Sequence, residues 1–117
     1  MNITDKFLSN ILSIRYEDIT PSAMTKLRTC LADTMSVALA GAYDLREKED
    51  KLLELLGKDG EVVCPIGFTE KTSLTNAILI NGLSAHFLEL DDGVRYGVIH
   101  PSAPLFAALI PVAGVVD

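Results

Sequence analysis

Residues 20–41 read TPSAMTKLRTCLADTMSVALAG and predict the main helix of the fold. Thr20 has a side chain that can cap a helix, and Pro21 fits the first helical position, where no backbone N–H is needed. Gly41 stands where a glycine commonly ends a helix. The apolar positions in between repeat at helical spacing, at Met24, Leu27, Leu31, Met35 and Ala38. We therefore expect an amphipathic helix that buries this stripe and ends at Gly41.

Shorter helices are predicted on both sides of this segment. Before it, Thr4 is a suitable N-cap for an amphipathic helix that ends near Arg15, with apolar positions at Phe7, Leu8, Ile11 and Leu12. After it, Leu45–Leu56 predicts a second, charged helix with leucines on one side, closed by Gly57. Its charged run, residues 46–51, is interpreted as a face in contact with solvent.

The C-terminal half predicts two apolar helices and at most one short extended segment. The extended segment lies near 61–65, where Pro65 restricts it to a sheet edge or an isolated strand. A helix over about 72–88 is apolar on nearly every face, which favours burial among other helices. Residues 103–116 predict the last helix, with a kink at Pro111. The expected fold class is all-α.

The composition is that of one folded domain. The chain has 117 residues, 49% of them apolar and 22% charged, and its net charge of −6 would repel a nucleic-acid backbone. Cys30 and Cys64 lack metal or redox spacing, so we expect reduced thiols packed in the core. The N-terminus lacks a signal-peptide pattern, which favours a cytoplasmic protein. Three prolines in the uncharged run 96–116 argue against a membrane span.

Most ionisable groups of the C-terminal third gather in residues 81–102, NGLSAHFLELDDGVRYGVIHPS. Between Ala77 and Val116 the charged residues are Glu89, Asp91, Asp92 and Arg95, and they are flanked by His86 and His100. Charges are costly to bury unless they are paired or used in chemistry. This window is therefore the candidate functional site.

The expected local structure brings these groups together. His86 and Glu89 are three residues apart, which places them on one face of a helix. His100 precedes Pro101, so its backbone favours an extended conformation that can direct the ring back to the acidic end of that helix. A histidine that faces carboxylates is suited to proton transfer near neutral pH.

Two other interpretations of the window stay open at this point. In the structural one, Asp91 or Asp92 pairs with Arg95, Ser102 caps the last helix, and the histidines satisfy buried carbonyl groups. In the other, the window holds a metal ion, although the spacing of the possible ligands matches no standard motif; they are His86, Glu89, Asp91 and His100.

At these residues the sequence resembles a known family. Residues 81–93, NGLSAHFLELDDG, followed by HPS at 100–102, closely resemble the N-terminal signature of the MmgE/PrpD family. Residues 31–41, LADTMSVALAG, resemble the helix of that family that ends in small residues and a glycine. The family includes 2-methylcitrate dehydratase, cis-aconitate decarboxylase and iminodisuccinate epimerase.

The resemblance implies both a fold and a chemistry. Members combine a large helical-bundle domain, built from N- and C-terminal parts of the chain, with a smaller α+β lid domain. They are typically homodimers and use no cofactor and no metal. They act on small di- and tricarboxylates by removing or relocating a proton next to a carboxylate. Loss of water or carbon dioxide, or re-protonation on the other face, completes the reaction.

The resemblance also implies roles for individual residues. His100 matches the active-site histidine of the family, and Glu89 stands where the decarboxylase branch has an active-site aspartate. Asp91 and Asp92 match the paired aspartates of the signature, so these four are the expected catalytic residues. Gly93 stands where the decarboxylase branch has a substrate-contacting threonine. The expected substrate-binding residues are Gly93, Arg95, Ser102 and His86.

We expect residues 1–117 to be the N-terminal helical domain of such an enzyme, without its lid. The lysine and further histidines that complete family active sites lie beyond Asp117, so the chain is expected to be inactive alone. The expected partners are a small polycarboxylate in the full-length context and a second copy or a complementary C-terminal part. The alternative is a non-catalytic helical module that uses its apolar helices to bind a partner chain.

Overall fold

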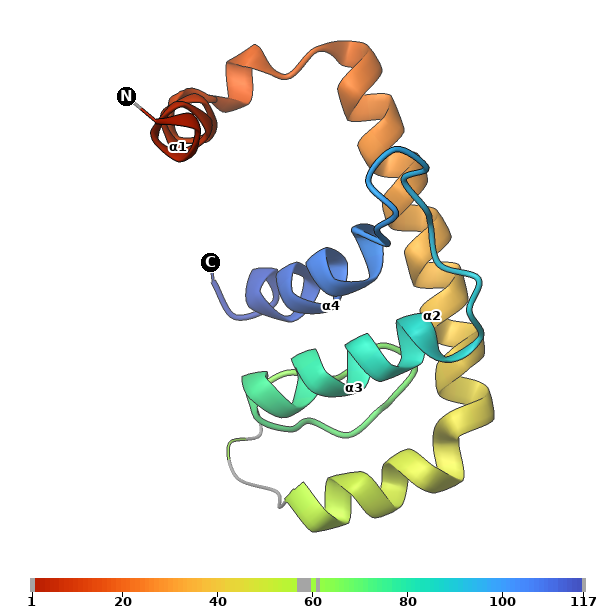
Figure 1. Ribbon diagram of the computed structural model, residues 1–117. Coiled ribbons are helices and arrows are strands. Elements are labelled where there is room, and N and C mark those ends of the chain that lie inside the picture. The colour runs from red at the N-terminus through yellow and green to blue at the C-terminus, as the bar shows by residue number, and fades with distance from the viewer. Residues whose placement is uncertain (1, 57–59, 61, 117) are drawn as a thin grey trace.

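The computed structural model describes residues 2–56, 60 and 62–116, and within α2 it leaves out the side chains of 47–50, 52, 53, 55 and 56. Helices dominate these residues, so the expected all-α class is confirmed (Figure 1). In chain order the elements are α1 (Ile3–Ser13), the 3-10 helix η1 (Tyr16–Asp18), α2 (Pro21–Leu56), α3 (Leu74–Phe87) and α4 (Ser102–Ala113).

Three of the helices form the body of the molecule. α3 and α4 lie side by side and extend from α2 in the same direction, and the last part of α2 turns to run along α3 (Figure 1). By contrast, α1 packs against none of the other described helices and buries none of its own residues. The candidate site therefore depends on the α2–α3–α4 body alone.

The start of α2 is as predicted, but its end is not. The hydroxyl oxygen of Thr20 accepts a hydrogen bond from the Ala23 N–H at 3.2 Å, and Pro21 is the first helical residue. The helix does not end at Gly41, and the separate helix predicted for Leu45–Leu56 is its continuation. Figure 1 shows that the change of direction is made by a bend within the yellow part of α2.

Gly41 has a different role, which is to allow α2 and α3 to approach closely. The residue is buried, and a Cβ atom placed on it would lie far inside van der Waals contact with the carbonyl oxygen of Ser84 in α3. Glycine is thus required by helix packing at this position, and the helical geometry continues through it. The sequence pattern alone does not distinguish this use of glycine from a helix stop.

The other helix boundaries differ from the predictions by a few residues. The N-cap of α1 is Asn2, not Thr4, because Asp5 completes a reciprocal pair of hydrogen bonds with Asn2, at 2.8 and 3.2 Å. α1 ends at Ser13, before Arg15. α3 begins at Leu74 after the cap Ser73, close to the predicted start at about residue 72.

The last helix is shorter than predicted. α4 begins at Ser102 and ends at Ala113, one residue before Gly114, so it does not reach Val116. The predicted extended segment is present as an isolated antiparallel bridge between Val63 and Thr72. Its first position, residue 61, lies outside the described residues.

One buried side-chain amide, that of Asn81 in α3, connects α3 to the loop before it and to α4. Asn81 of α3 is 1% exposed; its Oδ1 accepts a hydrogen bond from the Ile66 N–H at 2.7 Å, and its Nδ2 donates to the Ala107 carbonyl at 3.4 Å. The loop before α3 and the middle of α4 are thereby held to the same side chain. The core around them is formed by Ala38, Ile66, Ala85 and Ala103, with Ile110 packed against it.

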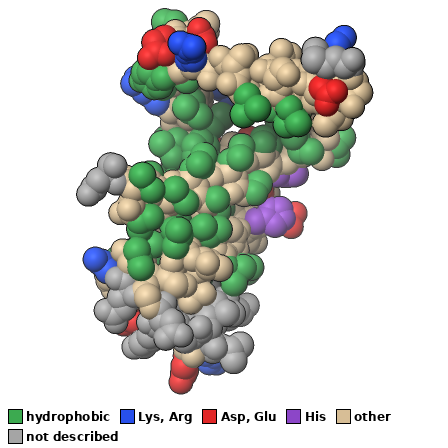
Figure 2. Space-filling view, turned by 90° about the vertical axis from the view of Figure 1, so that its left-hand side faces the viewer, with side chains coloured by type: hydrophobic (Ala, Val, Ile, Leu, Met, Phe, Trp, Pro, Cys, Tyr) green, Lys and Arg blue, Asp and Glu red, His purple; other side chains and the backbone are tan. Residues whose placement is uncertain are grey.

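Apolar surface remains exposed on this body, so α3, which was expected to be buried among other helices, is only partly covered by them. Leu79 and Leu83 of α3 are 45% and 43% exposed, and Leu105 of α4 is 57% exposed. Figure 2 shows hydrophobic side chains gathered across one face of the molecule. Among the described residues, no helix has the length and apolar character needed to cross a membrane.

The two cysteines are free, as predicted, but they do not both pack in the core. Cys30 is half-buried in α2. Cys64 is exposed, and its Sγ lies 3.5 Å from the Thr69 carbonyl oxygen. Cys64 lies in the loop before α3, where the isolated bridge leaves one side of the chain in solvent.

Candidate functional site

The centre of the candidate site is the carboxylate of Asp91, just beyond the end of α3. Its side chain is 1% exposed. Nδ1 of His86 lies 3.0 and 3.1 Å from the two Asp91 oxygens, and Nδ1 of His100 lies 3.4 Å from Oδ2. The two imidazole rings stand edge to face with their centres 6.0 Å apart. One buried carboxylate therefore contacts both histidines of the chain.

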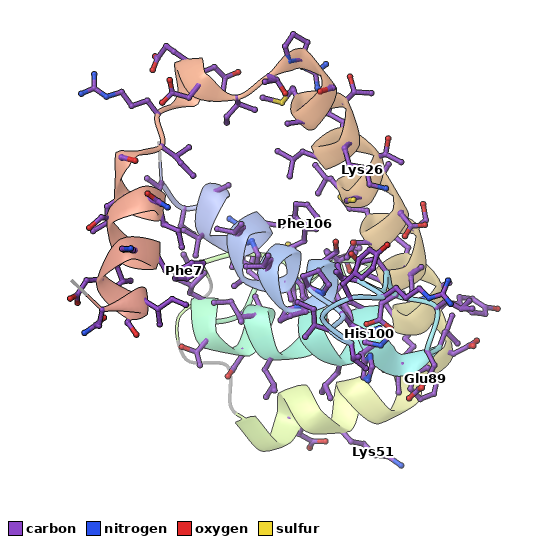
Figure 3. The ribbon with its side chains drawn as sticks, turned by 45° about the horizontal axis from the view of Figure 1, so that its top comes forward. Phe7, Lys26, Lys51, Glu89, His100 and Phe106 are labelled. Atoms are coloured by element: carbon purple, nitrogen blue, oxygen red, sulfur yellow. The ribbon has the colours of Figure 1, made fainter. Side chains whose placement is uncertain are left out.

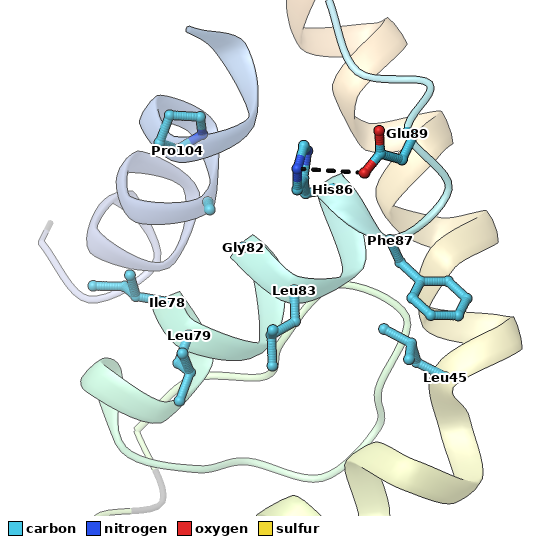
Figure 4. Close-up of a pocket in the computed structure, with 10 residues that line it drawn as sticks. Leu45, Ile78, Leu79, Gly82, Leu83, His86, Phe87, Glu89 and Pro104 are labelled. Carbon is cyan, nitrogen blue, oxygen red and sulfur yellow. Dashed lines mark ion pairs between the residues drawn. The ribbon is translucent and has the colours of Figure 1, made fainter. Parts of the chain in front are cut away.

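A sharp turn at the end of α3 places Asp91 against His86. The helix ends at Phe87, and Glu89 adopts a positive φ of 53°, a left-handed conformation that glycine usually occupies at this position. We predicted that Glu89 and His86 share one face of a helix, and this prediction is wrong because Glu89 lies beyond the helix end. Its Oε1 still lies 3.9 Å from Nε2 of His86, but the Glu89 side chain is 84% exposed, so this ion pair is weak (Figure 4).

A tight hairpin over residues 94–99 brings His100 back to Asp91. The Val94 N–H donates to the Ile99 carbonyl at 2.8 Å, and the Gly97 N–H donates to the Val94 carbonyl at 3.1 Å. The predicted direction of His100, back toward the acidic end of α3, is what this hairpin produces. Val98 has a φ of 49°, which is costly for a β-branched residue. No sequence signal indicated this strained position.

Asp92 and Ser102 contact each other at the start of α4. The Ser102 N–H donates to one carboxylate oxygen of Asp92 at 2.9 Å, and its hydroxyl donates to the other at 2.8 Å. Ser102 is thus the first helical residue, and Asp92 supplies the cap that the structural interpretation assigned to Ser102. This pair fixes the helix that follows His100.

The partners assigned by the structural interpretation are therefore wrong. Asp91 contacts the two histidines and Asp92 contacts Ser102, while Arg95 has no ion-pair partner among the described residues. Arg95 instead borders a hollow of about 380 Å³ beside the hairpin, together with Gly93, Val94, Val98, Ile99 and His100. A Cβ on Gly93 would meet nothing within 4 Å, so packing does not require glycine there.

A family model described as the MmgE/PrpD N-terminal domain matches residues 6–117. The chain belongs to the MmgE/PrpD family. No curated protein and no solved structure matches it. The matched range includes α2, α3, α4 and the whole window 81–102, so the contacts of Asp91 belong to the N-terminal domain of an MmgE/PrpD protein.

This MmgE/PrpD domain also has an apolar groove that the sequence did not reveal. The groove has a volume of about 700 Å³ and carries His86 and Glu89 at one end (Figure 4). The rest of its lining is mainly apolar and comes from Leu45, Ile78, Leu79, Gly82, Leu83, Phe87, Pro104 and Ala107. Leu79, Leu83 and His86 follow one another at helical spacing, and this pattern is the signal that could have found it.

The predicted site residues of the MmgE/PrpD domain fall into two groups of contacting side chains, and Gly93 and Arg95, which border the hairpin hollow, belong to neither. His86, Glu89, Asp91 and His100 form one constellation, whereas Asp92 and Ser102 form a separate pair at the start of α4. His100 and Glu89 lie on the same side of the molecule, away from Phe7 of α1 (Figure 3). In the part of the chain that is described, no three His, Cys, Asp or Glu side chains form a group that could hold a metal ion.

Proposed function

We propose that this domain is the N-terminal part of a lyase or isomerase that acts on small di- or tricarboxylates, with His100 as its proton-transfer group. The contact between the buried Asp91 carboxylate and Nδ1 of His100 carries the proposal. A carboxylate at Nδ1 favours the proton on that nitrogen and orients the ring. The other nitrogen, Nε2, then keeps its lone pair as a proton acceptor.

The exposure of His100 fits this role. Its side chain is 55% exposed and borders the hairpin hollow, so a substrate in that hollow can reach the ring. When Nε2 takes a proton from the carbon next to a substrate carboxylate, the electron pair of the C–H bond stays on that carbon. In dehydration that pair forms a C=C bond as hydroxide leaves from the neighbouring carbon, and in epimerisation it takes a proton back on the other face. In decarboxylation the protonated ring instead donates its proton to a C=C carbon next to a carboxylate, and the electron pair of the breaking C–CO₂ bond forms the new double bond as carbon dioxide leaves. Asp91 stabilises the imidazolium formed in between.

Arg95 supports the proposed substrate class. It borders the same hollow as His100 and has no carboxylate partner among the described residues. A guanidinium recognises carboxylates with two parallel hydrogen bonds, so Arg95 is suited to hold one carboxylate of a di- or tricarboxylate near His100.

The test joins residues 1–117 to the remaining part of a family member and measures turnover of 2-methylcitrate, citrate and cis-aconitate. His100→Asn is expected to lower kcat by a factor of about 10² to 10⁴, because the general acid or base is lost. Tyr96→Ala is the matched control, since Tyr96 lies in the same hairpin and is 100% exposed. Near-normal turnover by the His100→Asn variant, with an unchanged thermal melt, would refute the assignment.

A second candidate function is a helical module that binds a partner chain. The exposed apolar residues of α3 and α4, and an α1 with no buried residue, favour it. The encoding locus discriminates between the two functions. Continuation, in frame or after a frameshift, into sequence with the lysine and further histidines of the family supports the enzyme, and their absence supports the module.

A further inference from the structure

The buried carboxylate of Asp91 has an unusual pair of partners, because both of them are imidazole nitrogens of the same type. An ionised carboxylate only accepts hydrogen bonds, so a neutral imidazole can bond to it only with the nitrogen that carries the proton. The hydrogen-bond partner is Nδ1 of His86, 3.0 Å from Oδ2. Nδ1 of His100 lies 3.4 Å from the same oxygen in a longer, electrostatic contact, and the negative charge beside it favours the proton on that nitrogen. With 1% of its side chain exposed, the carboxylate is shielded from solvent.

We propose that Asp91 is a shared positioning residue that fixes the same tautomer in both histidines and thereby makes His86 a second proton acceptor. In this tautomer each ring has its proton on Nδ1 and its lone pair on Nε2. The Glu89 carboxylate, 3.9 Å from Nε2 of His86, is too distant for a hydrogen bond and too exposed to draw the proton to that nitrogen. The shorter, two-oxygen contact holds His86 more firmly than the single contact holds His100.

The two histidines border different hollows of the molecule. His100 borders the hollow beside the hairpin, whereas His86 borders the apolar groove along α3, where its side chain is 57% exposed (Figure 4). The rings are 6.0 Å apart and inclined by 72°, so one ring does not cover the other. A substrate that spans both hollows would meet two proton acceptors oriented by one carboxylate.

The two neighbouring aspartates therefore have different structural roles. Asp91 acts on the histidines, while Asp92 bonds to Ser102 at the start of α4 and contacts neither ring. The role of His86 in proton transfer rests on the proposed function. The tautomers of the two histidines are independent of the proposed function, because they are fixed without a substrate and can be measured in the substrate-free chain.

Nitrogen-15 NMR of the imidazole groups in the 117-residue chain tests the proposal. The chain has two histidines, so the spectra of His86→Gln and His100→Gln assign every signal. At a pH where the rings are neutral, both histidines are expected to show protonated Nδ1 and unprotonated Nε2. The remaining histidine should keep this pattern in each single variant.

Asp91→Asn provides the decisive comparison. An amide offers one accepting oxygen, and its NH₂ group cannot face a protonated Nδ1, so at least one ring should shift toward the Nε2–H tautomer. Asp92→Asn is the matched control; it weakens the cap of α4 and should leave both tautomers unchanged. Amide spectra report whether each variant is folded.

The outcomes separate this inference from the proposed function. A wild-type ring with its proton on Nε2 would overturn the inference without any variant, and so would unchanged tautomers in a folded Asp91→Asn chain. Loss of the expected turnover in the joined enzyme, with both tautomers as described, would refute the proposed function and leave the role of Asp91 intact.

Discussion

The carboxylate of Asp92 accepts two hydrogen bonds from Ser102, one from the backbone N–H at 2.9 Å and one from the hydroxyl at 2.8 Å. Ser102 is the first residue of α4, so its N–H has no partner inside the helix, and the carboxylate stands at the positive end of the helix dipole. The contact joins residues ten positions apart and closes the loop that carries His100.

Loss of this cap should destabilise the domain. Asp92→Ala is expected to lower the free energy of unfolding by about 1–2 kcal/mol, because it removes the partner of the Ser102 N–H and hydroxyl. Urea denaturation followed by circular dichroism measures the change. Asp33→Ala is the control, since Asp33 is exposed on α2, and it should stay within about 0.5 kcal/mol. Equal losses for both variants would contradict a capping role.

Two helical glycines should respond in opposite directions to alanine. In Gly41→Ala the new methyl group meets the backbone of Ser84, so α2 and α3 must separate and the free energy of unfolding should fall by about 2–3 kcal/mol. Gly82→Ala finds only the Ala107 methyl at 3.9 Å, so its higher helix propensity should raise stability by up to about 1 kcal/mol. Thermal melts of the two variants, compared with wild type, check the pair. A gain in stability for Gly41→Ala would show that the helices are not in close contact.

Helix positions could be predicted from the sequence because caps and apolar spacing are local signals. Thr20 with Pro21 marked the start of α2, and the apolar run from about residue 72 located α3. The end of α2 could not be predicted, because Gly41 is a contact with α3 and that contact exists only once the chain has folded. Similarly, the cap of α4 comes from Asp92, ten residues before the helix.

The residue composition of the sequence located the candidate site, but it did not predict which of the charged residues and histidines contact one another. The gathering of charges and histidines in 81–102 selected the window in which Asp91 contacts both histidines, and the extended backbone before Pro101 predicted that His100 turns back. The pairing of Asp91 with both rings depends on the left-handed turn at Glu89 and the hairpin at 94–99. Those conformations are set by the tertiary structure and have no glycine signal at Glu89 or Val98.

Exposed apolar surface should make the purified chain associate with itself. The chain is expected to be mostly helical by circular dichroism and to sediment as a mixture of oligomers, because α1, α3 and α4 leave large apolar side chains in solvent. The double variant Leu79→Gln, Leu83→Gln should shift the distribution toward monomer, and Thr75→Gln, an exposed polar position of α3, should not. A wild-type chain that sediments as one monomeric species would contradict the prediction.

Glycine should relieve the backbone strain on both sides of Asp91. Glu89 and Val98 have φ values of 53° and 49°, and a non-glycine residue in this region costs roughly 1–3 kcal/mol. Part of that gain is offset by the greater freedom of glycine in the unfolded chain, so Glu89→Gly and Val98→Gly should each raise the free energy of unfolding by about 1 kcal/mol. Val94→Gly is the matched control, because Val94 belongs to the same hairpin without a positive φ, and it should lower stability. Urea titrations of the three variants give the signs. If Val98→Gly and Val94→Gly both lower the free energy of unfolding, the hairpin backbone is not strained at Val98. The conformation that directs His100 toward Asp91 then needs no support from the surrounding structure.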